Sequence, residues 1–208
     1  MRKLLISTGV SLLVLVLALA VVFPAINSSA RSEPTEELPR LWDAPDFTLT
    51  NQTGETITAD DLRGQVWAAD FFFTSCPGIC PMLSANMRGL NDALADHPRK
   101  SELQLVSFSL DPENDTVDVL AEYARAFEIT TDEWQFLTGP RQAIWDLSID
   151  GFKLEVQDTP DDLMNPILHS GKVVLVDREG VIRGFYDGLT PLGMAELQAD
   201  IRRLLEEG

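Results

Sequence analysis

The chain has 208 residues, enough for one globular domain with a real core plus a short additional segment. Its 16 basic and 33 acidic residues give a formal net charge of −17, while the hydrophobic content is an ordinary 45%. The acidity excludes nucleic acid as a partner, because phosphate binding needs a basic surface. We attribute the acidity to solubility, and steering of a basic partner protein or a cation is the alternative.

The N-terminal segment has the pattern of a membrane anchor. Arg2 and Lys3 precede an uncharged stretch from Leu4 to Phe23, and about 20 apolar residues are enough to cross a bilayer as a helix. By the positive-inside rule, the tip stays in the cytoplasm and the rest of the chain lies on the extracytoplasmic, periplasmic side. We therefore expect residues 1–24 to form a transmembrane helix. A cleaved signal peptide with a site near residues 28–30 is the alternative.

Residues 25–44 are largely polar and contain prolines, so we expect a linker, followed by one domain over residues 45–208. The domain opens with two short segments, 47–49 and 55–58, whose separation by Asn51-Gln52-Thr53-Gly54 predicts a hairpin. An apolar run rich in aromatic residues, 66–73, is typical of a buried central strand.

Helices and strands then alternate along the chain. Apolar spacing predicts a helix over 81–96 with Pro81 in its first turn, and another helix that starts at Asp115 or Thr116 and continues to 127. The remaining predicted elements are strands at 103–110 and 134–137, a helix from 140 to 147, a hairpin of 172–176 with 181–186, and a closing helix over 194–205. This order predicts an α/β fold with a mostly parallel central sheet, helices on both faces, and antiparallel strands from the two hairpins, which make the sheet mixed.

The only two cysteines, Cys76 and Cys80, lie where the predicted strand 66–73 gives way to a helix. The positive end of a helix lowers the pKa of a thiol and raises its reactivity. A disulfide across so short a loop would stabilise the fold little, which disfavours a purely structural role. Three functions remain open on this evidence: a dithiol–disulfide exchanger, a peroxide-reducing thiol enzyme, and a metal site.

A metal site needs a third ligand, and the chain has two histidines. His97 stands at a helix end before Pro98, and we expect it to be solvent-exposed and inert. His169 stands in a loop immediately before a predicted strand, and in α/β sheets functional sites gather at such loops. Two thiolates and an imidazole form a soft, three-coordinate set that suits copper, whereas structural zinc and iron–sulfur sites normally take four ligands.

Several motifs together resemble the Sco (SenC/PrrC) family of copper chaperones over a stretch from about Pro45 to the C-terminus. In chain order they are Phe73-Thr74-Ser75-Cys76-Pro77-Gly78-Ile79-Cys80-Pro81, Ser109-Leu110-Asp111-Pro112-Glu113-Asn114-Asp115-Thr116, Phe136-Leu137-Thr138-Gly139, and Leu168-His169-Ser170 before Val174-Leu175-Val176-Asp177. The resemblance implies a thioredoxin-like fold, a membrane anchor, and a metal-binding carrier that is not an enzyme, although it can have a secondary thiol–disulfide reductase activity.

The same resemblance makes Cys76, Cys80 and His169 the ligands of one copper ion per chain. It implies delivery to the dinuclear copper centre of cytochrome c oxidase subunit II or another copper acceptor, and a copper donor protein or thiol reductant as further partner. A redox-active disulfide between Cys76 and Cys80 would switch metal binding off. Asp111 and Asp115 match an acidic motif of the family, and we interpret them as a turn and a helix cap.

The residues around the cysteines also bear on two other classes of function, peroxide reduction and thiol–disulfide exchange. Peroxiredoxins carry Pro-x-x-x-Thr-x-x-Cys, and here Ala69 and Phe73 replace the proline and the threonine, which counts against peroxide chemistry. Thioredoxins place a cis-proline beside the dithiol, where this chain offers Leu168-His169. A membrane-tethered thiol–disulfide oxidoreductase is the main alternative to a copper carrier, and a redox sensor is a weaker one.

Overall fold

A computed structural model describes residues 37–129, 133–162 and 166–207 of the chain. The predicted anchor, residues 1–24, and the linker up to residue 36 lie outside these ranges. Within the described ranges no helix has both the length and the apolar character needed to span a bilayer. Residues from Leu38 onward form one compact unit.

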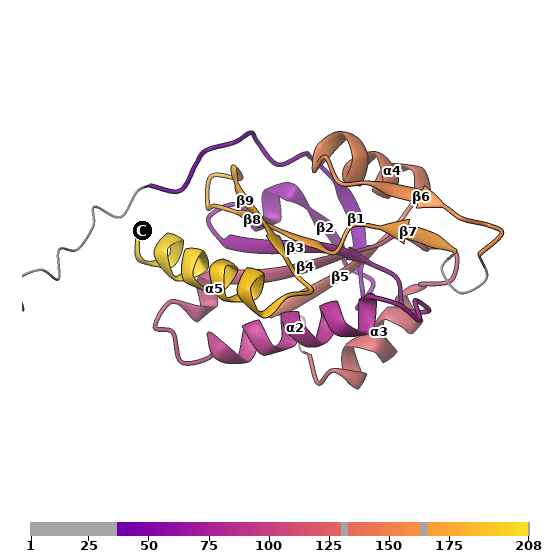
Figure 1. Ribbon diagram of the computed structural model, residues 1–208, viewed down its shortest axis with the longest axis horizontal. Coiled ribbons are helices and arrows are strands. Elements are labelled where there is room, and N and C mark those ends of the chain that lie inside the picture. The colour runs from indigo at the N-terminus through magenta and orange to yellow at the C-terminus, as the bar shows by residue number, and fades with distance from the viewer. Residues whose placement is uncertain (1–36, 130–132, 163–165, 208) are drawn as a thin grey trace, which may run out of the picture. The chain divides into compact units, whose positions relative to one another are not determined.

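The strands and helices follow the predicted alternation, with additions in the second half (Figure 1). The strands are β1 (Thr48–Asn51), β2 (Thr56–Thr58), β3 (Val66–Phe72), β4 (Leu103–Ser109), β5 (Trp134–Thr138), β6 (Val156–Asp158), β7 (Ile167–His169), β8 (Lys172–Val176) and β9 (Ile182–Asp187). The helices are α2 (Cys80–Ala93), α3 (Val117–Ala126), α4 (Arg141–Asp146) with a π-helical turn at Leu147–Gly151, and α5 (Pro191–Glu206); short 3-10 turns lie at Ala59–Leu62 and Lys100–Glu102.

Seven of these strands form one mixed sheet in the order β2-β1-β5-β4-β3-β8-β9. Only the β3–β4 and β4–β5 pairs are parallel, and the pairs that involve β1, β2, β8 and β9 are antiparallel. The expectation of a mostly parallel sheet is therefore wrong, whereas the mixed α/β class is confirmed. The late hairpin β8–β9 pairs with β3 inside the sheet, so it is an integral part of the fold.

Helices cover the sheet on two sides. Figure 1 shows α2, α3 and α5 along one side, with α4 and the β6–β7 pair on the other. The crossovers β3–α2–β4 and β4–α3–β5 join neighbouring parallel strands that run in the same direction. Because both right-handed crossovers step the same way across the sheet, from β3 to β4 and from β4 to β5, α2 and α3 share a side.

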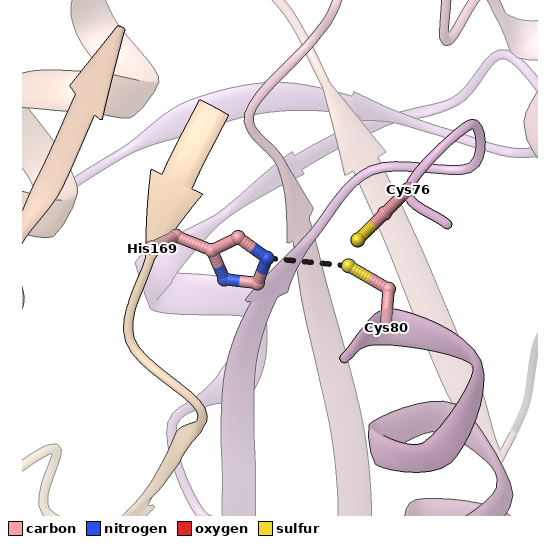
Figure 2. Close-up of side chains that lie close together, drawn as sticks. All are labelled: Cys76, Cys80 and His169. Atoms are coloured by element: carbon pink, nitrogen blue, oxygen red, sulfur yellow. Dashed lines mark hydrogen bonds between the residues drawn. The ribbon is translucent and has the colours of Figure 1, made fainter. Parts of the chain in front are cut away.

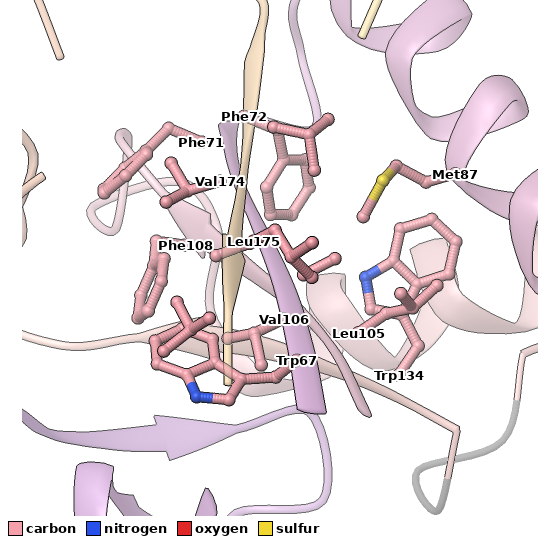
Figure 3. Close-up of a cluster of buried hydrophobic side chains, with 14 of the residues drawn as sticks. Trp67, Phe71, Phe72, Met87, Leu105, Val106, Phe108, Trp134, Val174 and Leu175 are labelled. Atoms are coloured by element: carbon pink, nitrogen blue, oxygen red, sulfur yellow. The ribbon is translucent and has the colours of Figure 1, made fainter. Parts of the chain in front are cut away.

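The core lies on both faces of β3, whose seven residues are all buried. Successive side chains of a strand point to opposite faces, and Phe71 and Phe72 follow this rule (Figure 3). Phe71 stacks on Phe108 and contacts Phe152 beside α4, while Phe72 packs against Tyr123 of α3. This strand therefore anchors both helical layers, and its carboxyl end, from which the cysteine loop emerges, is held rigidly.

Residues 38–44, which the sequence assigns to the linker, lie along β9. Leu38 is buried, the backbone N–H of Leu41 donates to the carbonyl of Ile182 at 3.0 Å, and that of Ile182 donates to Trp42 at 2.8 Å. The Arg183 guanidinium, itself buried, donates to the carbonyls of Leu38 and Pro39 and to Asp177.

Candidate metal centre

The cysteine loop connects the carboxyl end of β3 with the amino end of α2. The N–H of Cys76 donates to the carbonyl of Phe73 at 3.2 Å, which closes a tight turn. Cys80 is the first residue of α2, and Pro81 occupies the first turn, where its missing N–H costs no helical hydrogen bond. The exposed fractions are 7% for Cys76 and 1% for Cys80, and neither thiol is in a disulfide.

His169 reaches the cysteines from another part of the sequence. The sequence places it in a loop, but the structure places it at the end of the short strand β7, opposite Val156 of β6. Its ring packs edge-on against Phe73 at a centroid distance of 5.8 Å, and the residue is 9% exposed. The two-stranded β6–β7 sheet, which sequence analysis missed because its strands have only three residues, therefore holds the imidazole in position.

The three candidate ligands converge on one point. Their ligand atoms all lie within 4.8 Å of one another, and Sγ of Cys80 is 3.2 Å from Nε2 of His169. Figure 2 shows the imidazole approaching from β7, with Cys80 at the start of α2 and Cys76 in the preceding loop. Within the part of the chain that the structure describes, no other group of three potential metal ligands occurs.

The hydrogen bond of Nδ1 determines which ring nitrogen of His169 is available to bind a metal. Nδ1 lies 3.1 Å from the carbonyl oxygen of Ser170, and a carbonyl can only accept, so Nδ1 carries a proton and donates it. The nitrogen that faces the sulfurs is therefore Nε2. In the neutral ring Nε2 has a free lone pair, which is the arrangement in which histidine binds a metal.

The pKa values of the two thiols are shifted in opposite directions. Burial raises the pKa of Cys76, but hydrogen bonds from His169, from the backbone N–H groups of Cys80 and Gly78 and from the Cys80 thiol outweigh it and lower this pKa to about 6. Burial dominates at Cys80 and raises its pKa, although a hydrogen bond from the backbone of Phe73 acts in the other direction. At neutral pH Cys76 is thus a thiolate and Cys80 a thiol, and a metal must displace the Cys80 proton on binding.

This donor set fits copper better than other common metals. Two sulfurs and one imidazole are soft to intermediate ligands. Among the described residues, no histidine, cysteine or carboxylate joins them as a fourth ligand. Structural zinc normally takes four ligands. Copper(I) accepts low coordination by thiolates, so the open fourth direction suits a metal that is to be handed on.

A cavity gives access to this cluster from the solvent side of β7. It has a volume of about 700 Å³ and is lined by residues of β6, β7 and the preceding loop, including His169 and Leu168. Leu168 is 59% exposed, and Met82, two residues beyond Cys80, is 47% exposed. The cavity therefore borders His169, whereas neither cysteine belongs to its lining.

Asp115 does not cap α3, in contrast to one of the two predicted cap positions. Thr116 is the N-cap of α3, where its hydroxyl accepts from the N–H of Val119 at 3.5 Å. The Asp115 side chain is fully buried and accepts hydrogen bonds from Thr74 and Ser109. Burial raises the pKa of Asp115, and these hydrogen bonds oppose the shift. Asp115 is therefore neither a cap nor a member of the ligand cluster.

Asp111 behaves as the sequence predicts. Its carbonyl accepts from the N–H groups of Asn114 at 3.0 Å and of Asp115 at 2.8 Å, and its carboxylate accepts from the side chain of Asn114. The residue is partly exposed and forms the turn that precedes α3. The turn half of the interpretation of Asp111 and Asp115 is confirmed, and the cap belongs to Thr116.

A second buried acid, Asp70, escaped sequence analysis. It lies within β3 and is 0% exposed; Oδ1 accepts from the hydroxyl of Ser107, and no described residue donates to Oδ2. Burial raises its pKa to about 6, although the Ser107 hydrogen bond and the electrostatic interaction with His169 oppose the shift. An acid in the middle of a strongly apolar run was the signal that could have identified it.

His97 remains apart from the cluster. It is partly buried, in contrast to the predicted exposure, because Nδ1 accepts from the backbone N–H of Arg99 at 3.2 Å. This hydrogen bond closes the turn after α2, so His97 has a local structural role.

Comparisons with known proteins agree with this geometry. The family model SCO1/SenC matches residues 39–206, a range that includes all three candidate ligands. A relative in Bacillus subtilis (strain 168), the SCO1 protein homolog, is 31% identical over 165 residues, which cover 79% of this chain and 83% of the relative.

Solved structures have the same fold. BsSco, a member of the Sco family of cytochrome c oxidase assembly proteins for which a disulfide switch has been identified, aligns with a TM-score of 0.72 at 29% identity over 84% of this chain and 100% of its own. Arabidopsis thaliana ScoI with copper bound aligns with a TM-score of 0.66 over 79% of this chain and 99% of its own; at 24% identity this likeness concerns the fold alone.

Proposed function

Because this chain belongs to the SCO1/SenC family, we propose that it is a copper carrier that binds one ion through Cys76, Cys80 and His169. Its acceptor is the dinuclear copper centre of cytochrome c oxidase subunit II. The observation that carries the proposal is the convergence of three soft ligand atoms within 4.8 Å in a buried site. The oxidase-assembly role named for the Sco family, to which BsSco belongs, supports it.

The geometry favours transfer over storage. Three ligands leave room for a further bond from an acceptor thiol or imidazole, and His169 lines a cavity of about 700 Å³ beside the site. Each new bond to the acceptor can replace one bond to the carrier, so the ion never has to become free. Such ligand exchange changes no covalent bond of the acceptor, and we therefore propose a carrier and not an enzyme.

Thiol redox chemistry acts as the switch on binding. Oxidation joins the two sulfurs, releases the proton of Cys80 and passes two electrons to an oxidant such as a protein disulfide. The disulfide removes two of the three ligands at once. Copper binding therefore requires the reduced chain, which a thiol reductant has to maintain in an oxidising compartment.

Copper titration tests the proposal on the full chain. The reduced protein is expected to bind one equivalent of copper(I), measured by competition with a chromogenic chelator, and the oxidised protein none. Cys76→Ser and Cys80→Ser should weaken binding by at least about 100-fold, since loss of a group that merely supports a ligand costs about 10–100-fold. Equal copper binding by the reduced and oxidised protein would contradict the proposal.

A thiol–disulfide oxidoreductase is the second candidate, and the unequal acidities of the thiols favour it. A thiolate at Cys76 beside a protonated Cys80 is the arrangement that attacks a target disulfide and then resolves the mixed disulfide. This function predicts turnover with a protein disulfide that does not depend on copper. Turnover retained by His169→Ala, measured at a pH at which Cys76 is ionised in both chains, would favour the oxidoreductase as the main activity.

We also propose that residues 1–24 anchor the chain in a membrane, with the domain on the periplasmic side. The proposal rests on the charge pattern around the uncharged stretch from Leu4 to Phe23. Retention of the chain in membranes after alkaline carbonate extraction, together with cleavage by protease added to the periplasmic side, is expected. Complete release into the soluble fraction would support the signal-peptide alternative.

A further inference from the structure

Asp115 connects three segments at the carboxyl edge of the sheet. Its carboxylate accepts from the backbone N–H of Thr74 at 3.1 Å, from the Thr74 hydroxyl and from the hydroxyl of Ser109. Thr74 belongs to the cysteine loop, Ser109 ends β4, and Asp115 itself precedes α3. Because β3 and β4 are parallel neighbours, their carboxyl ends lie side by side, and one short carboxylate can reach both.

Thr74 is the residue through which the turn at the cysteines can be fixed. The turn runs from Phe73 to Cys76, whose N–H donates back to the Phe73 carbonyl, so Thr74 is its first central residue. Phe73 on one side packs against the ring of His169, and Cys76 on the other side supplies a sulfur. A displacement of Thr74 would therefore move both a ligand and the support of a second ligand.

The chemistry of Asp115 matches this task. An ionised carboxylate is an acceptor only, and its hydrogen bonds are stronger than those between neutral groups. Burying a charge is costly unless it is compensated, and the described contacts of Asp115 are with N–H and O–H donors. These hydrogen bonds compensate the cost of burial, and they tie the carboxylate to Thr74 and Ser109.

We infer that Asp115 is a positioning residue that fixes the Phe73–Cys76 turn, and through it the metal site, in the binding geometry before copper arrives. Such preorganisation raises affinity because the loop does not have to be ordered on binding. The copper part of the test rests on the proposed function, whereas the conformational part can be measured on the metal-free chain.

The test compares four single variants of the reduced full-length chain and one double variant, Asp115→Asn with Thr74→Val. Asp115→Asn removes the charge, and Thr74→Val removes the hydroxyl that donates to it. Asp111→Asn neutralises a nearby acid whose carboxylate contacts Asn114. Ile201→Val, in the buried face of α5, lowers overall stability without a change in the loop.

Asp115→Asn and Thr74→Val are each expected to lower copper(I) affinity by about 10- to 100-fold, the range found when a group that orients a ligand is removed. Hydrogen exchange followed by mass spectrometry should become faster in peptides that contain residues 73–76 of the metal-free chain, with α5 unchanged. The double variant should lose less affinity than the sum of the single losses, because both remove the same contact. Asp111→Asn and Ile201→Val should leave the loop exchange and the copper affinity at wild-type values.

Wild-type copper affinity and wild-type loop exchange in Asp115→Asn would overturn the inference. A loss of affinity in Ile201→Val as large as that in Asp115→Asn would overturn it as well, since general stability would then be the cause. Where Asp115→Asn does not fold, Thr74→Val decides by the same two readouts. A wild-type chain that binds no copper would contradict the proposed function, while hydrogen exchange in the metal-free chain would still decide the role of Asp115.

Discussion

Nε2 of His169 lies 3.2 Å from Sγ of Cys80, although 89 residues separate them in the sequence. The contact exists because β7 ends beside the amino end of α2 and because Nδ1 is held by the carbonyl of Ser170. An imidazole oriented in this way can accept from a thiol, donate to a thiolate when protonated, or bind a metal. It is the contact that distinguishes a metal site from a simple dithiol.

Replacing His169 by alanine should weaken copper(I) binding by at least about 100-fold, because it removes one ligand of three. The cysteines would remain, so the chain should still bind copper weakly through two sulfurs. Chelator competition on the reduced chain measures the change. His97→Ala is the matched control, since His97 bonds only to its local turn, and it should bind like the wild type. Equal affinities of the two variants would remove His169 from the ligand set.

Alkylation of the metal-free, reduced chain should report the unequal acidities of the thiols. The iodoacetamide rate at Cys76 is expected to rise through an inflection at about pH 6 and to level off near neutral pH. Cys80, whose pKa burial raises, should stay unmodified over the range in which an ordinary thiol of pKa about 8.5 ionises. Peptide mass spectrometry distinguishes the two sites. His169→Ala should move the inflection to higher pH, because a hydrogen bond from His169 stabilises the thiolate.

A pH-dependent change in stability is expected from Asp70. The pKa of Asp70 is about 6 in the folded chain, whereas an unperturbed aspartate, as in the unfolded chain, has a pKa of 3.8. The folded chain therefore binds the proton more tightly. The stability that this proton supplies is complete below pH 3.8 and is lost as the pH rises through 6. Asp70→Asn, which mimics the protonated acid, should therefore raise the free energy of unfolding by about 1–3 kcal/mol at pH 8 and change it little at pH 4.

Urea unfolding at the two pH values measures this difference. Asp111→Asn serves as the control, because Asp111 is partly exposed and its replacement should give no comparable gain at pH 8. A destabilised Asp70→Asn chain at pH 8 would mean that the ionised carboxylate has a favourable partner in the folded state.

Thr116→Ala should separate the helix cap from the metal site. Loss of the hydroxyl that accepts from Val119 removes the N-cap of α3 and should cost about 1 kcal/mol of folding stability. Copper affinity should stay at the wild-type value, because Thr116 does not contact the cysteine loop. Thermal unfolding and chelator competition on the same samples measure both quantities. A strong loss of copper affinity would show that α3 itself, and not Asp115 alone, positions the loop.

Most elements of the fold could be predicted because their signals are local. The largely apolar strand β3, the apolar spacing in α2 behind Pro81 and the turn residues of both hairpins each leave a pattern within one short window. The π-helical turn after α4 and the three-residue strands β6 and β7 leave no such pattern. Their formation depends on packing against the rest of the domain, so sequence analysis placed His169 in a loop.

The sequence by itself determined the candidate ligands and the place of the thiols at a strand–helix junction, because chemical type and spacing are written along the chain. It could not determine which partner an acid would take. Asp115 looked like a helix cap, and only the tertiary structure assigned its carboxylate to Thr74 and Ser109, because the parallel pairing of β3 and β4 brings their carboxyl ends together. Burial likewise raised the pKa values of Cys80 and Asp70, while hydrogen bonds lowered that of Cys76, and both effects act only once the chain has folded.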